Sequence, residues 1–228
     1  RIQIAIITKL INNTKFKIDK GDHLLDTHTH ILWNIDDGSK NQCMSLQMLE
    51  IAARSGTKAI FATPHVIERA NKPSWEEIKE KTQQLRQLCA EAQIDIMLYP
   101  GAEVQMNWEL LPELGATGAY CLNGGRYLLV ELPAAEIPAY ADEFWYELEL
   151  KGIMPILAHP ERYQQLRENP DLLLLWRRRG MLMQCNSGSF TGMFGSSVCE
   201  NAKVLLANGL VDLLRSEEHT SELQSPYD

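Results

Sequence analysis

The sequence predicts a single α/β domain whose strands pair in parallel. Segments typical of strands alternate with segments typical of helices along most of the chain, and parallel neighbours require such helical crossovers. The composition is that of a globular protein, with 45% apolar and 23% charged residues among 228. This length is sufficient to bury a hydrophobic core, and no internal repeat or linker divides it.

Seven segments combine apolar runs with glycine or proline near their ends, a pattern that indicates strands. They are residues 24–29, 58–62, 95–99, 127–132, 153–158, 181–185 and 210–214. Five segments between them have the apolar spacing of helices. They are residues 44–54, 74–92, 138–150, 171–179 and 198–207. The second helix has the clearest start, because Ser74 and Glu77 have the spacing of a capping box.

The two ends of the chain differ from the segment between them. Residues 1–23 do not begin with methionine and are rich in Ile, Asn, Lys and Thr, so we interpret them as a non-native leader. From Arg215 the chain reads RSEEHTSELQS, which matches the in-frame translation of a common sequencing-adapter oligonucleotide. We therefore interpret residues 215–228 as an adapter-derived tail, and we expect a domain at residues 24–214 that is incomplete at its C-terminus.

Charge and cysteine usage exclude several classes of protein. The net charge of −8 disfavours nucleic-acid binding through phosphate contacts. The five cysteines are scattered and never have C-x-x-C spacing, which indicates a reducing cytoplasm and argues against a thiolate zinc site. No apolar run approaches the ~20 residues that a helix needs to cross a bilayer, so we expect no membrane insertion.

Histidines and carboxylates gather at the carboxyl ends of the expected strands. In barrels of parallel strands this rim is where functional groups meet, and imidazoles together with carboxylates bind divalent transition metals. A carboxylate can also bridge two ions. The sequence therefore predicts a metal centre, with more than one ion, among six side chains. These are His28, His30, His65, Glu103, Glu131 and His159.

Each of these signals also has a plainer interpretation when it is taken alone. The spacing Asp26-x-His28-x-His30 also fits a strand with polar residues facing solvent. The sequence Asp36-Asp37-Gly38 is typical of a turn, and only its nearness to the histidines favours Asp37 as a ligand. His65 also fits an ordinary loop histidine.

The later segments leave similar alternatives. Glu103 and Glu131 could pair at the rim with Arg126 or a lysine. The run 159–162 could cap a helix, with Arg162 paired to Glu161 or Glu168, and the run 186–187 could cap the next helix. The five tryptophans are interpreted as packing residues rather than as a ligand platform.

The motifs occur in an order that resembles the PHP (polymerase and histidinol phosphatase) superfamily. They are H-T-H at 28–30, I-D-D-G at 35–38, T-P-H at 63–65, G-A-E at 101–103, L-V-E at 129–131, A-H-P-E-R at 158–162 and N-S-G-S at 186–189. The I-D-D-G and A-H-P-E-R motifs narrow the resemblance to the manganese-dependent protein-tyrosine phosphatases of bacterial capsule and exopolysaccharide loci.

The resemblance implies a distorted (β/α)7 barrel, related to the TIM barrel, whose last strand region is incomplete here. It implies two or three metal ions, usually Mn²⁺, with iron, cobalt or zinc as alternatives. Arg162 would hold the phosphate, Asp37 and His65 would take part in catalysis, and Glu103 would bridge two ions. The implied metal ligands are His28, His30, Asp37, His65, Glu103, Glu131 and His159.

The family also implies a substrate, the phosphotyrosine tail of a bacterial tyrosine kinase that controls capsule or exopolysaccharide synthesis, and we expect that the chain can form homo-oligomers. Two alternatives stay open. One is a phosphatase for small molecules of the histidinol-phosphate type. The other is a truncated, non-catalytic domain, because the S-D-x-H motif and the later arginine of the family do not follow Leu214.

Overall fold

The computed structural model describes residues 24–115 and 118–215. The expected leader and all of the expected tail except Arg215 therefore lie outside the described residues. A first sheet has the strand order β1-β2-β4 and contains only parallel pairs. Its strands are β1 (Leu24–Thr29), β2 (Thr57–Ala62) and β4 (Met97–Pro100).

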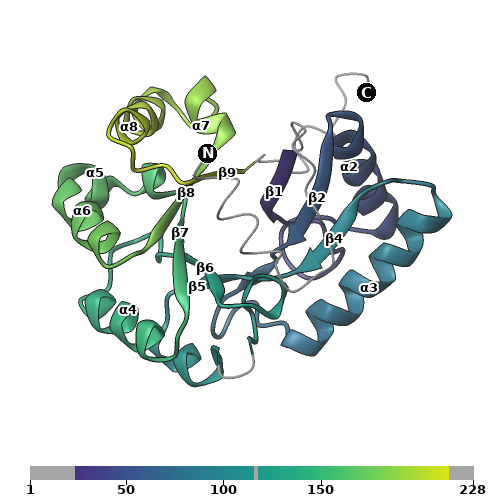
Figure 1. Cartoon of the computed structure of the whole chain (residues 1–228), viewed down its shortest axis with the longest axis horizontal. Coiled ribbons are helices and arrows are strands. Elements are labelled where there is room, and N and C mark those ends of the chain that lie inside the picture. Colours follow the sequence, from purple (N-terminus) through teal and green to yellow (C-terminus); the bar gives the residue numbers. More distant parts are fainter. Residues whose placement is uncertain (1–23, 116–117, 216–228) are drawn as a thin grey trace.

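A second parallel sheet has the order β3-β5-β6-β7-β8-β9. Its strands are β3 (His65–Val66), β5 (Glu103–Gln105), β6 (Tyr127–Glu131), β7 (Met154–Ala158), β8 (Leu182–Asn186) and β9 (Leu213–Arg215). The two sheets curve around a shared interior, and the helices lie outside them (Figure 1). The α/β class with parallel strands is confirmed, while closure into one barrel stays a prediction, because the ladders of the described residues form two sheets.

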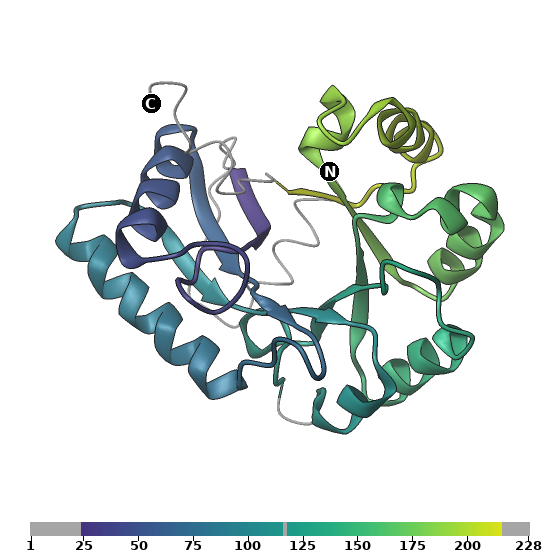
Figure 2. The same cartoon turned by 180° about the vertical axis from the view of Figure 1, so that it is seen from behind.

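The five expected helices are confirmed, with bounds that differ by a few residues. They are α2 (Gln42–Arg54), α3 (Trp75–Glu91), α4 (Ala141–Leu150), α6 (Pro170–Arg178) and α8 (Ser196–Ala207). Ser74 Oγ accepts a hydrogen bond from the amide of Glu77 at 3.1 Å, which is the N-terminal half of the expected capping box. Viewed from behind, the same helices line the outer side of both sheets (Figure 2).

Several short elements were not expected. They are strands β3 and β5, helices α5 (Gln164–Glu168) and α7 (Ser187–Thr191), and the short 3₁₀ helices η1 (Trp108–Glu113), η2 (Leu122–Gly124) and η3 (Pro160–Arg162). Elements of two to six residues are too short to show a hydrophobic period. Three of them nevertheless matter for the site, because β3 begins with His65, β5 begins with Glu103 and η3 ends with Arg162.

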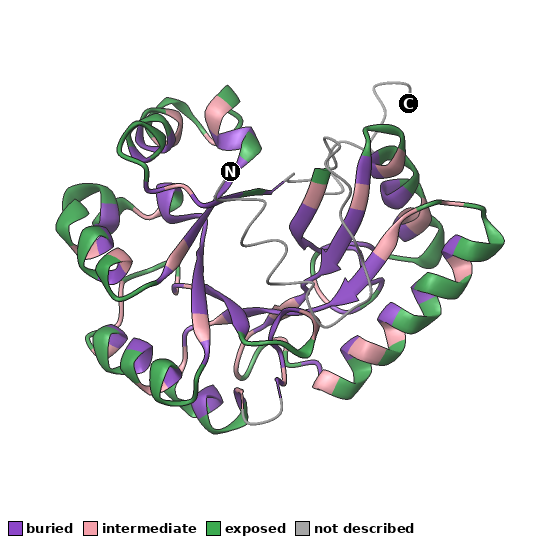
Figure 3. Cartoon of the chain, in the orientation of Figure 1, coloured by how far each residue is buried: buried purple, intermediate pink, exposed green. Residues whose placement is uncertain are grey.

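The strands are buried on both faces, and the helices are buried on one (Figure 3). In β6, Leu128 and Val130 belong to the large core beneath the helices, whereas Leu129 belongs to a smaller core inside the curved sheets. Such two-sided burial is usual for parallel sheets. Trp145 and Trp176 pack edge to face at 5.6 Å between α4 and α6, as expected for packing residues. Within the described residues, no helix is long and apolar enough to cross a membrane.

Candidate metal centre

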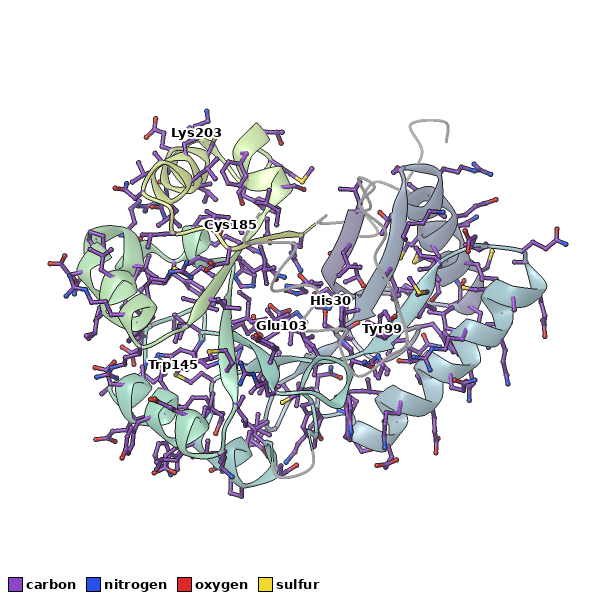
Figure 4. All side chains as sticks on the ribbon, in the orientation of Figure 1. His30, Tyr99, Glu103, Trp145, Cys185 and Lys203 are labelled. Carbon is purple, nitrogen blue, oxygen red and sulfur yellow. The ribbon has the colours of Figure 1, made fainter. Side chains whose placement is uncertain are left out.

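The expected site residues come together in the interior between the two sheets. Figure 4 shows His30 and Glu103 in this interior, reached from opposite sheets. His28 lies in β1 and is fully buried, and His30, just beyond the end of β1, is 4% exposed. The interpretation of the H-x-H segment as a strand with a solvent-facing polar side is therefore wrong, because its histidines point into the protein.

Glu103 is the centre of the arrangement and contacts the four histidines of the described residues, which are His28, His30, His65 and His159. Its side chain is 1% exposed, and its backbone pairs with His65 in the neighbouring strand β3. Glu103 Oε2 lies 2.9 Å from His28 Nε2 and 3.3 Å from His30 Nε2. The same oxygen lies 3.3 Å from His65 Nδ1, and Oε1 lies 2.9 Å from His159 Nε2.

The alternative that Glu103 pairs with Arg126 or a lysine is wrong. Within the described residues its ion pairs are with imidazoles, and the guanidinium of Arg126 lies over the ring of Tyr127 at 5.4 Å. A buried carboxylate is costly unless it is paired, and here imidazoles supply the pairing. His159 likewise makes no side-chain capping bond to η3, so its imidazole is free of the capping role considered above.

Hydrogen bonds on the outer nitrogens orient the two histidines of β1. His28 Nδ1 lies 2.8 Å from Gln184 Oε1, and His30 Nδ1 lies 2.7 Å from Asp36 Oδ2. Both partners are acceptors, so each Nδ1 carries a hydrogen and each neutral ring has its lone pair on Nε2. The two Nε2 atoms are 3.2 Å apart. His28 Nε2 has a free lone pair, and His30 Nε2 has one once its ring loses a proton. Two such nitrogens beside a carboxylate can bind a cation, so the donor set fits a metal ion.

Three overlapping groups of ligand atoms indicate room for more than one ion. They are His28, His30 and Glu103; His30, Asp37 and His65; and His65, Glu103 and Glu131, and within each group the ligand atoms lie within 4.8 Å of one another. His65 lies between the last two groups, with Nδ1 3.2 Å from Glu131 Oε1 and Nε2 3.8 Å from Asp37 Oδ1. His65 Nδ1 is buried and makes no hydrogen bond of good geometry. This nitrogen is therefore available to bind a metal ion.

Burial and charge shift the protonation of the centre. Burial, followed by the charge of Arg215, lowers the pKa of His28 to about 3, so this ring is neutral at pH 7. Burial also opposes protonation of His30, but its hydrogen bonds to Asp36 and Glu103 outweigh it and raise the pKa to about 10. Burial would raise the pKa of Glu103, but the surrounding imidazoles, His28 first, hold it well below its usual range.

Two residues that support the histidines were missed in the sequence. Asp36 does form the expected turn, with Oδ1 accepting from the Gly38 amide at 3.0 Å. Its Oδ2, however, orients His30 and accepts from the His65 amide at 3.0 Å. Gln184 is fully buried in β8. A polar residue inside an apolar strand was the available signal for Gln184, and the nearness of the turn to the histidines was the signal for Asp36.

Asp36→Asn is expected to weaken metal binding by about 10- to 100-fold, because loss of an outer-shell carboxylate leaves His30 less basic and less firmly oriented. Titration of the metal-free protein with Mn²⁺ would measure this change. Asp95→Asn is the matched control, since Asp95 is exposed and pairs with Lys58 at 3.1 Å. Unchanged affinity in Asp36→Asn would contradict the role assigned to this carboxylate.

A cavity of about 960 Å³ opens above the centre. Its lining includes the expected ligands His30, Asp37, His65, Glu103, Glu131 and His159, together with Arg162, Tyr163, Phe194 and Arg215. The guanidinium carbon of Arg162 lies 5.0 Å from the ring centroid of Phe194. Glu161 and Glu168, considered above as partners of Arg162, are bound elsewhere: Glu161 to Asn186 and Ser189, and Glu168 to Gln164. Arg162 thus brings a cation to the cavity that contains the carboxylates.

Comparison with known proteins places this site in a family. The family model described as capsular polysaccharide synthesis, CpsB/CapC, matches residues 24–227. The tyrosine-protein phosphatase YwqE of Bacillus subtilis is 34% identical over 196 residues, which cover 86% of this chain and 77% of YwqE. The tyrosine-protein phosphatase CpsB of Streptococcus pneumoniae is 27% identical over 90% of this chain and 86% of CpsB.

A solved structure agrees with the sequence comparison. It comes from work on YwqE from Bacillus subtilis and CpsB from Streptococcus pneumoniae, described there as unique metal-dependent tyrosine phosphatases. It superposes with a TM-score of 0.81 at 34% identity and covers 86% of this chain and 79% of the solved chain. The match to the family model, over residues 24–227, includes both sheets and Glu103. The chain therefore belongs to the CpsB/CapC family of capsular polysaccharide synthesis.

Proposed function

We propose that this chain is a metal-dependent protein-tyrosine phosphatase that acts on the phosphotyrosine tail of a bacterial tyrosine kinase controlling capsule or exopolysaccharide synthesis. The observation that carries the proposal is Glu103, buried against four imidazoles at the base of a cavity that also contains Arg162. Membership in a family whose relatives include tyrosine-protein phosphatases supports it.

We propose that two or three divalent ions bind at the overlapping ligand groups. The proposed ligands are His28, His30, Asp37, His65, Glu103, Glu131 and His159. A mixture of imidazoles and carboxylates suits manganese, and also iron, cobalt and zinc. We propose manganese, and metal analysis of the purified protein would decide among these ions.

The chain supplies the groups that phosphoryl transfer needs. Divalent ions bound here would lower the pKa of a water molecule and offset charge on the phosphoryl group. Arg162 lines the same cavity and can donate two parallel hydrogen bonds to phosphoryl oxygens. Asp37 and His65 lie at the open side of the centre, where a phosphate would enter. The leaving phenolate has a pKa of ~10, so its departure needs little acid assistance.

A nucleophile at Cys121 is not supported. Burial raises the pKa of Cys121 to about 12, and this thiol is fully buried. Tyr163 is not a nucleophile either, because burial, followed by the charges of Glu131 and Glu103, raises its pKa well above the usual range. Its hydroxyl is also bound to the Leu132 backbone, at 2.9 Å from the amide nitrogen. We therefore propose direct hydrolysis without a covalent intermediate.

The surroundings favour a protein substrate in a reducing compartment. The cavity, at about 960 Å³, is at the upper end of the range for small-molecule pockets and opens to solvent, which suits a side chain presented on a polypeptide. All five cysteines are free, so we propose a cytoplasmic location. Self-association stays a prediction that a sedimentation measurement would test.

The experiment is phosphate release by the Mn²⁺-loaded protein from a phosphotyrosyl peptide and from histidinol phosphate. We expect preference for the peptide and loss of activity on chelation. Arg162→Ala should lower kcat/KM on the peptide by about 10²- to 10³-fold, the usual effect of removing one transition-state donor. Arg54→Ala, which removes an exposed partner of Glu50, should retain activity.

Two outcomes would overturn parts of the proposal. Faster turnover of histidinol phosphate would favour the small-molecule phosphatase. Binding of the phosphopeptide without metal-dependent turnover would favour the non-catalytic alternative.

A further inference from the structure

The turn after β7 carries two of the proposed functional residues. His159 has a left-handed backbone, with φ of 36°, and its imidazole contacts Glu103. Arg162, three residues later, ends η3 and reaches the cavity. A left-handed backbone at a residue other than glycine costs about 1–3 kcal/mol and persists only where the surroundings hold it. The turn therefore needs an anchor.

Glu161 provides that anchor from within η3. Its side chain is fully buried, and Oε1 accepts hydrogen bonds from the Asn186 amide at 2.9 Å and from Ser189 Oγ at 2.7 Å. Its backbone carbonyl accepts a hydrogen bond from Asn201 Nδ2 at 3.0 Å. One residue thus connects the turn to the end of β8, to α7 and to α8.

The two oxygens of the Glu161 carboxylate differ in their hydrogen bonding. Glu161 Oε2 is buried, and within the described part of the chain no nitrogen or oxygen atom donates a hydrogen bond to it. Cys185, labelled in Figure 4, belongs to β8. Burial, followed by the charge of Glu161, raises the pKa of its thiol. Burying a carboxylate without a cation is unfavourable, so the two donors on Oε1 offset only part of the cost.

We infer that Glu161 is a positioning residue that holds Arg162 at the phosphoryl site; this inference rests on the proposed function. Arg162 lines the cavity with an exposed side chain, and holding a long side chain in one place costs rotamer freedom. The residue before it, Glu161, accepts a hydrogen bond from Ser189 in α7, which holds the backbone at this point. The guanidinium of Arg162 lies over the ring of Phe194, three residues beyond α7. Both contacts tie Arg162 to the α7 segment.

The test compares Glu161→Ala, Glu161→Gln and Arg162→Ala in the Mn²⁺-loaded protein. Glu161→Ala is expected to lower kcat/KM on a phosphotyrosyl peptide about 10- to 100-fold and to weaken inhibition by inorganic phosphate similarly, since small displacements of a positioned group have effects of this size. Glu161→Gln keeps an acceptor for Asn186 and Ser189, so it should restore most of the loss. Added to Arg162→Ala, the Glu161→Ala change should have little further effect.

A stability control separates positioning from general damage. Ile78→Ala creates a cavity beneath α3 on the other sheet and should lower the unfolding temperature without changing the phosphate inhibition constant. Should Glu161→Ala not fold, Ser189→Ala removes one of the two donors and should change that constant in the same direction, by a smaller factor.

The outcomes distinguish this inference from the proposed function. If the wild-type protein shows no metal-dependent turnover, the proposed function fails. If the wild-type protein is active and both Glu161→Ala and Ser189→Ala bind phosphate normally, only the positioning role fails. Multiplicative losses in the Glu161→Ala, Arg162→Ala double variant would also overturn it, because they would show that Glu161 does not act through Arg162.

Discussion

Glu103→Gln is expected to lower metal-dependent turnover by about 10³-fold or more. Glu103 is the only one of the proposed ligands that contacts all four histidines, so its loss removes the shared anion between the ligand groups. Bound ions contribute several kcal/mol of transition-state stabilisation, and each ~1.4 kcal/mol is a factor of ten in rate. The measurement is kcat/KM together with the number of bound ions per chain.

The same substitution should also destabilise the metal-free protein. Glu103 is one of two carboxylates paired with the buried, charged His30, and Asp36 is the other. Complete loss of a buried partner costs about 3–5 kcal/mol in measured cases, so the loss of Glu103 alone should cost less than that. Glu113→Gln is the control, because Glu113 is an exposed partner of Lys72. A Glu103→Gln protein with full metal content and full activity would contradict the central role assigned to Glu103.

Metal affinity is expected to increase with pH. In the metal-free site the pKa of His30 is raised to about 10, so this ring is protonated at pH 7 and a metal ion must displace that proton. Affinity should therefore rise about tenfold per pH unit for each proton released, up to about pH 10. His28, with its pKa lowered to about 3, is already neutral and adds no such dependence above pH 3.

Titrations with Mn²⁺ at pH 6, 7 and 8 would measure this slope. Calorimetry in two buffers of different ionisation enthalpy would count the released protons directly. Asp36→Asn removes a negative charge that raises the pKa of His30, so the slope should become shallower in that variant. An affinity that does not vary between pH 6 and 8 would show that His30 is not a ligand, or that it binds without losing a proton.

The parts of the fold that depend on local pattern could be predicted from the sequence. Apolar runs ended by glycine or proline located the longer strands, and apolar spacing with Ser74 as a cap located the longer helices. The position of His28, His30 and His159 near strand ends was also local information. Because parallel strands end at a common edge, it was enough to predict that these side chains meet.

Other features depend on residues far apart in the chain. Whether Glu103 pairs with a cation or with imidazoles depends on the register of β3 and β5, two strands too short to leave a sequence pattern. The sequence predicts only a turn at Asp36, whereas the structure shows that Asp36 also orients His30. Gln184 supports His28 because β8 brings it there from 156 positions away.

Glu161 illustrates the same limit for the phosphate site. The sequence suggests that Glu161 forms an ion pair with its neighbour Arg162. In the structure its carboxylate instead accepts hydrogen bonds from Ser189 in α7 and from Asn186 at the end of β8. Hydrophobic periodicity and turn chemistry act over a few residues, so a sequence reveals them directly. The pairing of buried polar groups is decided by long-range strand register and packing, so only the tertiary structure shows which group meets which.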